Sequence, residues 1–116
     1  MERVEQDDLL VVWTSGDRDV ALKMVFMYTG NAKRHGWWEG VTLLVWGPSQ
    51  KLLTEDEELQ AKLAEMLSLG VRVVACKACA DIYPVTDKLE DLGVEVFYTG
   101  QFLTDWIRSA GSVITF

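Results

Sequence analysis

Short apolar runs alternate along the chain with longer stretches whose apolar residues recur at helical spacing, and this alternation limits the folds available to it. The short runs are rich in β-branched and aromatic residues and are bounded by Gly, Asp or Ser, as strands are. We predict five strands, of which the first three are apolar at nearly every position, as strands covered on both faces should be. They lie at residues 9–13, 41–46, 71–75, 94–97 and 113–116.

The longer stretches between these runs predict helices. The second helix begins at Thr54 and Glu57, which stand in capping-box spacing, and Asp87 and Glu90 repeat that spacing within the third. We expect the first helix to turn inward a face made of Val20, Met24, Met27 and Tyr28, and the last helix one made of Leu103, Trp106 and Ile107. The predicted helices cover residues 17–34, 54–69, 77–92 with a break at Pro84, and 101–110.

The order of these elements predicts the fold class. A strand, a helical connection and a further strand in the same sheet imply right-handed parallel crossovers. We therefore predict an α/β fold with an open, mostly parallel five-stranded sheet and helices on both faces. With 116 residues the chain is too short for two ordinary domains of about 100 to 200 residues each, so we expect residues 1–116 to form one domain.

Charge and cysteine content narrow the classes of partner. The chain has 18 acidic against 11 basic residues and a net charge of -7, with the basic residues scattered, so nucleic acid is an unfavourable partner. The longest apolar run, residues 9–13, is far shorter than the ~20 residues that span a bilayer, and the first residues are acidic. We expect no membrane helix and no signal peptide. Two cysteines do not form a secreted disulfide framework, which favours a reducing cytoplasm.

Candidate site residues follow the strands directly, because ligands of an open parallel sheet bind beyond the carboxyl ends of its strands. After the first strand, Thr14, Ser15 and Gly16 offer hydroxyl and N–H groups to an anion, although the same residues also make an ordinary turn and helix cap. The candidates after the other strands are Pro48, Ser49, Cys76, Lys77, Cys79 and Tyr98.

Cys76 is the residue of this group with the most reactive chemistry. It ends the third predicted strand, and a helix follows it, so its sulfur should lie near backbone N–H groups that carry partial positive charge. Such a position favours the thiolate, and Lys77 supplies a cation whose direction the sequence leaves open. The alternative is that Cys76 and Cys79 are small buried hydrophobes.

Other site chemistries receive less support. A Cys-x-x-Cys pair suggests a thioredoxin-like redox couple, but that motif normally comes before most of the sheet. A structural zinc site needs four ligands, and the chain offers Cys76, Cys79 and the single histidine, His35, which we interpret as a surface or helix-capping residue. The sequence contains no Gly-x-Ser-x-Gly motif and no histidine placed to suggest a Ser-His-Asp triad. We expect no metal and no organic cofactor.

The five tryptophans exceed what a core of this size readily hides. Trp37 and Trp38 cannot both point inward from an extended segment, so we expect one of them to be partly exposed or covered by another subunit. Trp13 and Trp46 each end an apolar run. We interpret them as core packing in preference to an apolar wall around Cys76.

The chain resembles the DsrE/DsrF-like sulfur-relay family over nearly its whole length. The resemblance rests on the opening apolar strand with Thr14-Ser15-Gly16, the strand-end Ala75-Cys76 with Cys79, the segment 89–104 and the closing strand to Phe116. It implies a flavodoxin-like α/β fold of the YchN type, a homo-oligomer that is a trimer or hexamer, and a persulfide-carrying cysteine that corresponds to Cys76. Cys79 departs from the simplest one-cysteine pattern of the family.

Three functions remain open on these residues. The leading hypothesis is a sulfur carrier or sulfurtransferase that accepts a persulfide sulfur on Cys76 and passes it between donor and acceptor proteins, by the exchange chemistry of disulfides. This role requires Cys76 in a shallow pocket that a partner's cysteine can reach. The second is a thiol-disulfide oxidoreductase that uses Cys76 and Cys79. The third is a non-catalytic module that binds a small anion or nucleotide at Thr14-Ser15-Gly16.

Overall fold

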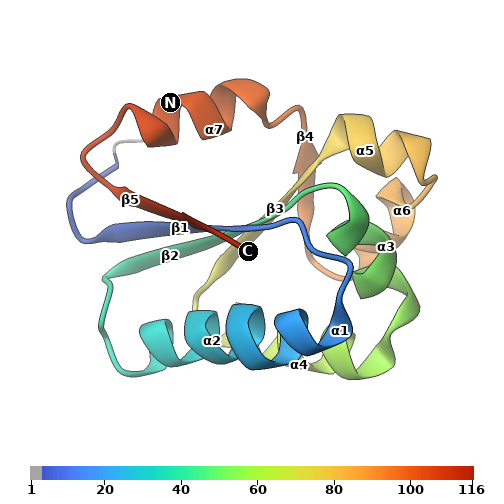
Figure 1. Cartoon of the computed structure of the whole chain (residues 1–116), viewed down its shortest axis with the longest axis horizontal. Coiled ribbons are helices and arrows are strands. Elements are labelled where there is room, and N and C mark those ends of the chain that lie inside the picture. Colours follow the sequence, from blue (N-terminus) through green and yellow to red (C-terminus); the bar gives the residue numbers. More distant parts are fainter. Residues whose placement is uncertain (1–3) are drawn as a thin grey trace.

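The computed structural model describes residues 4–116, which form one five-stranded sheet with helices on both faces (Figure 1). The strands lie in the order β4-β3-β2-β1-β5, and every neighbouring pair is parallel. The strands are β1 (Asp8–Trp13), β2 (Gly40–Val45), β3 (Arg72–Cys76), β4 (Glu95–Phe97) and β5 (Ser112–Thr115). The helices are α1 (Arg18–Val20), the π-helical η1 (Ala21–Phe26), α2 (Met27–Arg34), α3 (Pro48–Glu55), α4 (Glu57–Ser68), α5 (Lys77–Ile82), α6 (Thr86–Asp91) and α7 (Gly100–Ile107).

The strand order explains why the helices divide between two faces. The chain adds β2, β3 and β4 in one direction and then returns to place β5 on the other side of β1. Because parallel crossovers are right-handed, this reversal puts α7 on the face opposite the earlier helices. Figure 1 shows α7 above the strands β1 and β2, with α2 and α4 below them. The predicted fold class is therefore confirmed, and each predicted strand matches an observed strand to within one residue at either end.

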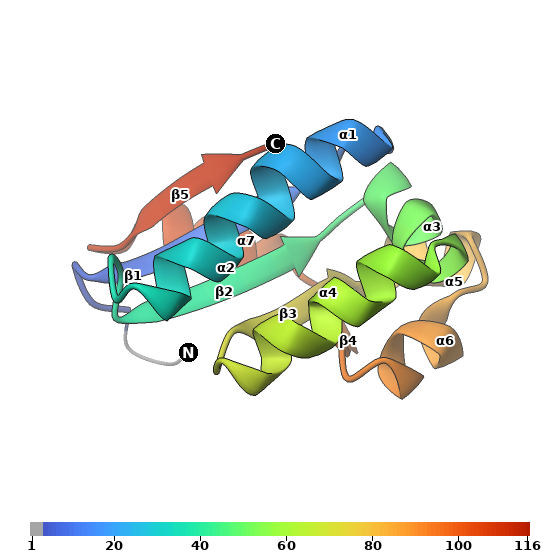
Figure 2. The same cartoon turned by 90° about the horizontal axis from the view of Figure 1, so that it is seen from below.

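Alternate side chains of the strands fill two separate cores. Leu9, Val11 and Trp13 of β1 face the larger core with the first helices, α4, α5 and α6. Leu10 and Val12 face a smaller core that Trp106 of α7 closes. Figure 2 shows α2 and α4 lying along the strands on the larger-core face. This two-sided burial is the reason why β1 is apolar at successive positions.

The inward face of the first helix differs in part from the one predicted: Val20 and Tyr28 pack against the larger core, whereas Met24 and Met27 do not. The helical segment is interrupted by η1, whose wider i→i+5 turns rotate the following residues about the helix axis. Met24 and Met27 are 48% and 56% exposed, whereas Ala21 and Val25 are fully buried. The prediction favoured large apolar side chains, but the small residues allow the helix to lie close to the sheet.

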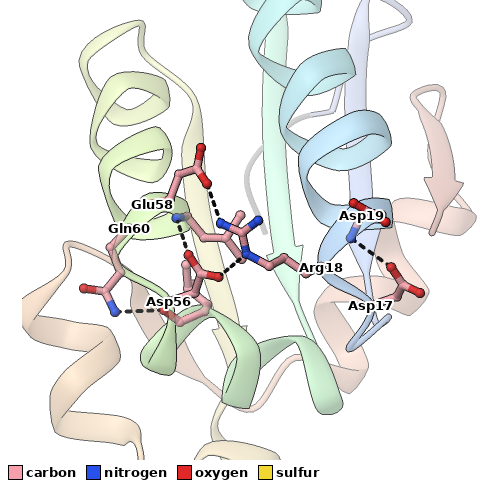
Figure 3. A network of polar contacts seen from close by, with 8 residues as sticks. Asp17, Arg18, Asp19, Asp56, Glu58 and Gln60 are labelled. Carbon is pink, nitrogen blue, oxygen red and sulfur yellow. Dashed lines mark hydrogen bonds and ion pairs between the residues drawn. The ribbon is translucent and has the colours of Figure 1, made fainter.

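The second predicted helix, 54–69, corresponds to α4 and to the last two residues of α3, a helix that we did not predict, and its predicted cap is wrong. Thr54 lies inside α3 and donates its hydroxyl hydrogen bond to the carbonyl of Gln50. The N-cap of α4 is Asp56, whose carboxylate accepts from the N–H of Leu59 at 3.0 Å. Asp56 also accepts from Arg18 Nε at 2.6 Å, and Figure 3 shows this guanidinium between Asp56 and Glu58. The cap thus joins α1 to α4.

Two further packing predictions differ from the structure. α6 begins after Val85 without a side-chain cap, so the Asp87 and Glu90 spacing does not form a capping box. Ile107 is 63% exposed because α7 turns Trp106 toward the smaller core. The expectation for the tryptophan pair is confirmed, since Trp37 is exposed while Trp38 is half-buried. Within residues 4–116, no helix is both long and apolar enough to cross a membrane.

We predict that Asp56→Ala lowers the urea midpoint of unfolding more than Thr54→Ala does, because only Asp56 caps α4 and holds Arg18. The hydrogen bond from Arg18, followed by that from the Leu59 N–H, lowers the pKa of Asp56. A carboxyl whose pKa is lowered by folding stabilises the protein above its unfolded pKa of about 4, and this contribution is lost as the pH falls through the folded pKa. Urea titrations of both variants at neutral and acidic pH measure this contribution of Asp56 to stability. Equal midpoints at neutral pH would contradict Asp56 as the cap.

Candidate functional site

Cys76 lies where three chain segments meet at the carboxyl edge of the sheet. It is the last residue of β3 and the N-cap of α5, and alternation along the strand directs its side chain to the same face as Val74, the face that carries α7. β4 pairs with β3 so that Phe97 stands opposite Cys76. The chain then turns through Thr99 into α7, which brings Thr99 to the sulfur.

The donors around the Cys76 sulfur come from two of these segments. The side-chain hydroxyl and N–H of Thr99 approach it from the turn before α7, and the N–H groups of Ala78 and Cys79 approach it from the first turn of α5. The sulfur makes no conventional cap hydrogen bond to α5, and its interaction with these N–H groups is the longer-range stabilisation of a developing anion. Cys76 is therefore surrounded by groups that favour negative charge.

Burial and hydrogen bonding act in opposite directions on Cys76. The residue is only 4% exposed, and burial is the largest single influence and raises the pKa of the thiol. The Thr99 hydroxyl and the three backbone N–H groups together outweigh it, so the pKa of Cys76 lies below its ordinary value. The Thr99 hydroxyl is fully buried and makes no hydrogen bond within the part of the chain that the structure describes, so it is free to donate to a thiolate at Cys76, whose pKa it lowers.

The burial of Cys76 differs from the open pocket that a carrier was expected to need. The side chain is covered because β4 and the turn to α7 lie beside the end of β3. Cys79, one helical turn further along, is half-buried and hence closer to solvent. Both cysteines are free thiols.

Cys79 lies between Cys76 and the turn that follows β2. The N–H of Gly47 and the indole of Trp46 interact with the Cys79 sulfur, so Trp46 contributes to the polar surroundings of the pair. Burial first, and then the negative charge of Cys76, raises the pKa of Cys79. The two thiols thus have opposite tendencies: Cys76 favours the thiolate and Cys79 favours the protonated form.

Lys77 does not direct its charge at the cysteines. Its ammonium Nζ lies 2.9 Å from a carboxylate oxygen of Asp81 and 5.9 Å from the ring centroid of Tyr98. The hydrogen bond to Asp81 raises the pKa of Lys77. Tyr98 is exposed, and its ring forms part of the surface beside the site. The cation that the sequence placed next to Cys76 is therefore engaged elsewhere.

The residues after β2 hold the strand ends in place. Pro48 begins α3, and Ser49 donates its hydroxyl to the carbonyl of Trp13 at 2.6 Å. Gln50, which the sequence reasoning missed, is fully buried and donates Nε2 to the carbonyl of Val45 at 3.1 Å and to that of Cys76 at 3.0 Å. These bonds fix the ends of three neighbouring strands, including the backbone from which the Cys76 sulfur projects.

The turn after β1 is closed by the chain's own last strand. The N–H groups of Thr14 and Ser15 and the hydroxyl of Thr14 all donate to the carbonyl of Phe116. The hydroxyl of Ser15 accepts from the N–H of Asp17. A Cβ at Gly16 would lie 3.3 Å from Pro48 Cβ, so this glycine permits a close approach. Three donors of the turn, the N–H groups of Thr14 and Ser15 and the Thr14 hydroxyl, thus bind the protein's own backbone and are not free for an anion.

Metal-ligating side chains are not gathered anywhere in residues 4–116: no group of three or more His, Cys, Asp or Glu is placed to hold an ion. His35 is the C-cap of α2, and its ring stacks on Trp37 with centroids 5.3 Å apart.

Comparisons with known proteins identify related chains. The family model described as the DsrE/DsrF-like family matches residues 37–116. The solved structure of the conserved protein of unknown function BT1422 from Bacteroides thetaiotaomicron has 32% identity and a TM-score of 0.92, with 95% of each chain covered. The ychN protein from E. coli has 19% identity and a TM-score of 0.72 over the full length of both chains, and shares the fold. No curated protein matches the sequence significantly.

We predict that Thr99→Val raises the pKa of Cys76, because it removes a donor to the thiolate while it keeps the side-chain volume. The titration midpoint of the Cys76 thiol should therefore move to higher pH. Thiolate absorbance against pH, measured in a Cys79→Ser background so that Cys76 is the only thiol, reports the change. Thr99→Ser keeps the hydroxyl and should titrate close to the parent. If both variants titrate like the parent, the hydroxyl does not act on the sulfur.

Proposed function

The chain belongs to the DsrE/DsrF-like family, and on this basis we propose that it is a sulfur carrier that accepts and passes on sulfur as a persulfide on Cys76. The observation that carries the proposal is the set of donors around the Cys76 sulfur, which lowers the pKa of a buried thiol. A structural cysteine in an apolar core has its pKa raised instead, and it is inert.

The reaction is an exchange between sulfur atoms. The Cys76 thiolate attacks the outer sulfur of a donor persulfide. A bond forms between Cys76 Sγ and that outer sulfur, the S–S bond of the donor breaks, and the donor leaves as a thiolate. Delivery repeats the step, with an acceptor thiolate attacking the outer sulfur on Cys76. Each step conserves electrons and needs only thiolates, so thiol exchange of this kind requires neither a metal nor an organic cofactor.

The same donors suit both the free thiolate and the loaded form. A persulfide carries its negative charge on the outer sulfur, which lies about 2 Å beyond Cys76 Sγ, the length of one S–S bond. N–H and hydroxyl groups from α5 and Thr99 that favour the thiolate would also favour the negative charge of a persulfide on the same residue.

Donor and acceptor proteins are part of this proposal, as is assembly into a homotrimer or homohexamer of the kind that the family resemblance implies. Large apolar side chains are exposed on the elements that flank the site, at Ile82 of α5, at Tyr98 and at Ile107 of α7. Such side chains are typical of contact surfaces. A reducing cytoplasm would keep Cys76 and Cys79 as thiols.

Incubation with a low-molecular-weight persulfide should add one sulfur atom to Cys76, seen by intact-protein mass spectrometry as a gain of about 32 Da. We expect the gain in the Cys79→Ser variant, where it is not followed by reaction with a second thiol, and its absence in Cys76→Ser. Peptide mapping assigns the modified residue. An adduct that persists in Cys76→Ser would refute the proposal.

A further inference from the structure

The carrier reaction uses Cys76 alone, yet a second thiol lies one helical turn away. We propose that Cys79 releases the bound sulfur as hydrosulfide when no acceptor takes it, by attacking the persulfide on Cys76 and forming a Cys76–Cys79 disulfide. This activity rests on the proposed function, because it begins from the persulfide. Each sulfur atom that the chain accepts could then either be transferred to an acceptor protein or be released as hydrosulfide.

The backbone places the two sulfurs within reach of one another. Cys76 is the N-cap and has extended backbone angles, and Cys79 is the third residue of α5. Residues at the N-cap and N3 positions are one helical turn apart, so their side chains leave the backbone close together, although the Cys76 sulfur makes no cap hydrogen bond to α5. The negative charge of Cys76 raises the pKa of Cys79, and the Cys79 N–H lowers the pKa of Cys76, as expected of neighbouring groups. A disulfide needs Cβ atoms about 3.5–4.5 Å apart, a separation that this turn can supply with little movement of the backbone.

The surroundings of Cys79 also suit an attacking thiol. It is half-buried, whereas Cys76 is almost fully covered, so Cys79 is the more solvent-accessible residue of the pair. The N–H of Gly47 and the indole of Trp46 stabilise its thiolate as it forms. Burial and the charge of Cys76 raise the pKa of Cys79, which makes the attack slow and leaves time for an acceptor to collect the sulfur first.

The step balances without an external oxidant. Cys79 attacks the inner sulfur, Cys76 Sγ, and the bond between the two persulfide sulfurs breaks. The outer sulfur takes that electron pair and the proton of Cys79, and leaves as hydrosulfide. Counted from two thiols and one zero-valent carried sulfur, the cysteine pair loses two electrons on forming the disulfide and the departing sulfur gains the same two. Hydrosulfide is a weaker base than an alkyl thiolate and leaves faster, which favours this direction. A second round requires a dithiol reductant to reopen the disulfide.

The test compares persulfide lifetimes in two forms of the full chain. Wild type and Cys79→Ser are loaded with cysteine persulfide, freed of excess reagent, and followed by intact mass and by sulfide assay. In wild type, the gain of about 32 Da should disappear as one hydrosulfide per chain is released, leaving a mass about 2 Da below that of the reduced protein. In Cys79→Ser the adduct should last at least about tenfold longer. Asp87→Ser, at an exposed position on the neighbouring helix α6, is the control and should behave as wild type.

The outcomes separate this proposal from the carrier function. If Cys79→Ser loads and the wild-type adduct lasts equally long, the release step is overturned and the carrier function stands. If the adduct decays in both at one rate, release does not depend on Cys79 and the proposal is likewise overturned. If Cys79→Ser folds, as judged by circular dichroism, and does not load, the carrier function itself has failed.

Discussion

The donors that converge on the Cys76 sulfur are the interaction on which the functional site depends. They come from parts of the chain that are distant in sequence, the start of α5 and the turn at Thr99, and only the pairing of β3 with β4 brings them together. Burial of the sulfur opposes the thiolate, and the combined hydrogen bonds reverse that effect. The fold therefore produces a covered yet acidic thiol, a combination that neither burial nor exposure alone would give.

The topology also sets the limits of the site. Because β5 returns to the far side of β1, α7 is the single helix among residues 4–116 that crosses the opposite face, and its first residues follow Thr99 directly. Gln50, held in α3, ties the carbonyls of Val45 and Cys76 and so fixes the position from which the sulfur projects. The reversal of strand order at β1 and the buried Gln50 amide thus determine where the chemistry can occur.

Much of the fold could be predicted from the sequence, because strands buried on both faces are apolar at successive positions and are separated by helical spacing. The inward face of the first helix could not be predicted in full. The π-helical segment η1 changes the helical period, and the buried Ala21 and Val25 are smaller than Met24, which the prediction favoured. Of the site, the strand-end position of Cys76 was predictable. The roles of Thr99 and Gln50 were not predictable. Thr99 influences Cys76 only because β4 pairs with β3, and Gln50 binds backbone carbonyl groups, which a sequence motif does not indicate.

A crystal structure of the persulfide-loaded Cys79→Ser variant tests most directly whether Cys76 carries the sulfur. Electron density for one additional atom should extend from Cys76 Sγ by about 2 Å, the length of an S–S bond, with the N–H groups of Thr99 and Ala78 facing the pair of sulfurs. Loaded protein whose Cys76 shows no added atom, or an added atom that points away from these donors into apolar side chains, would contradict the account.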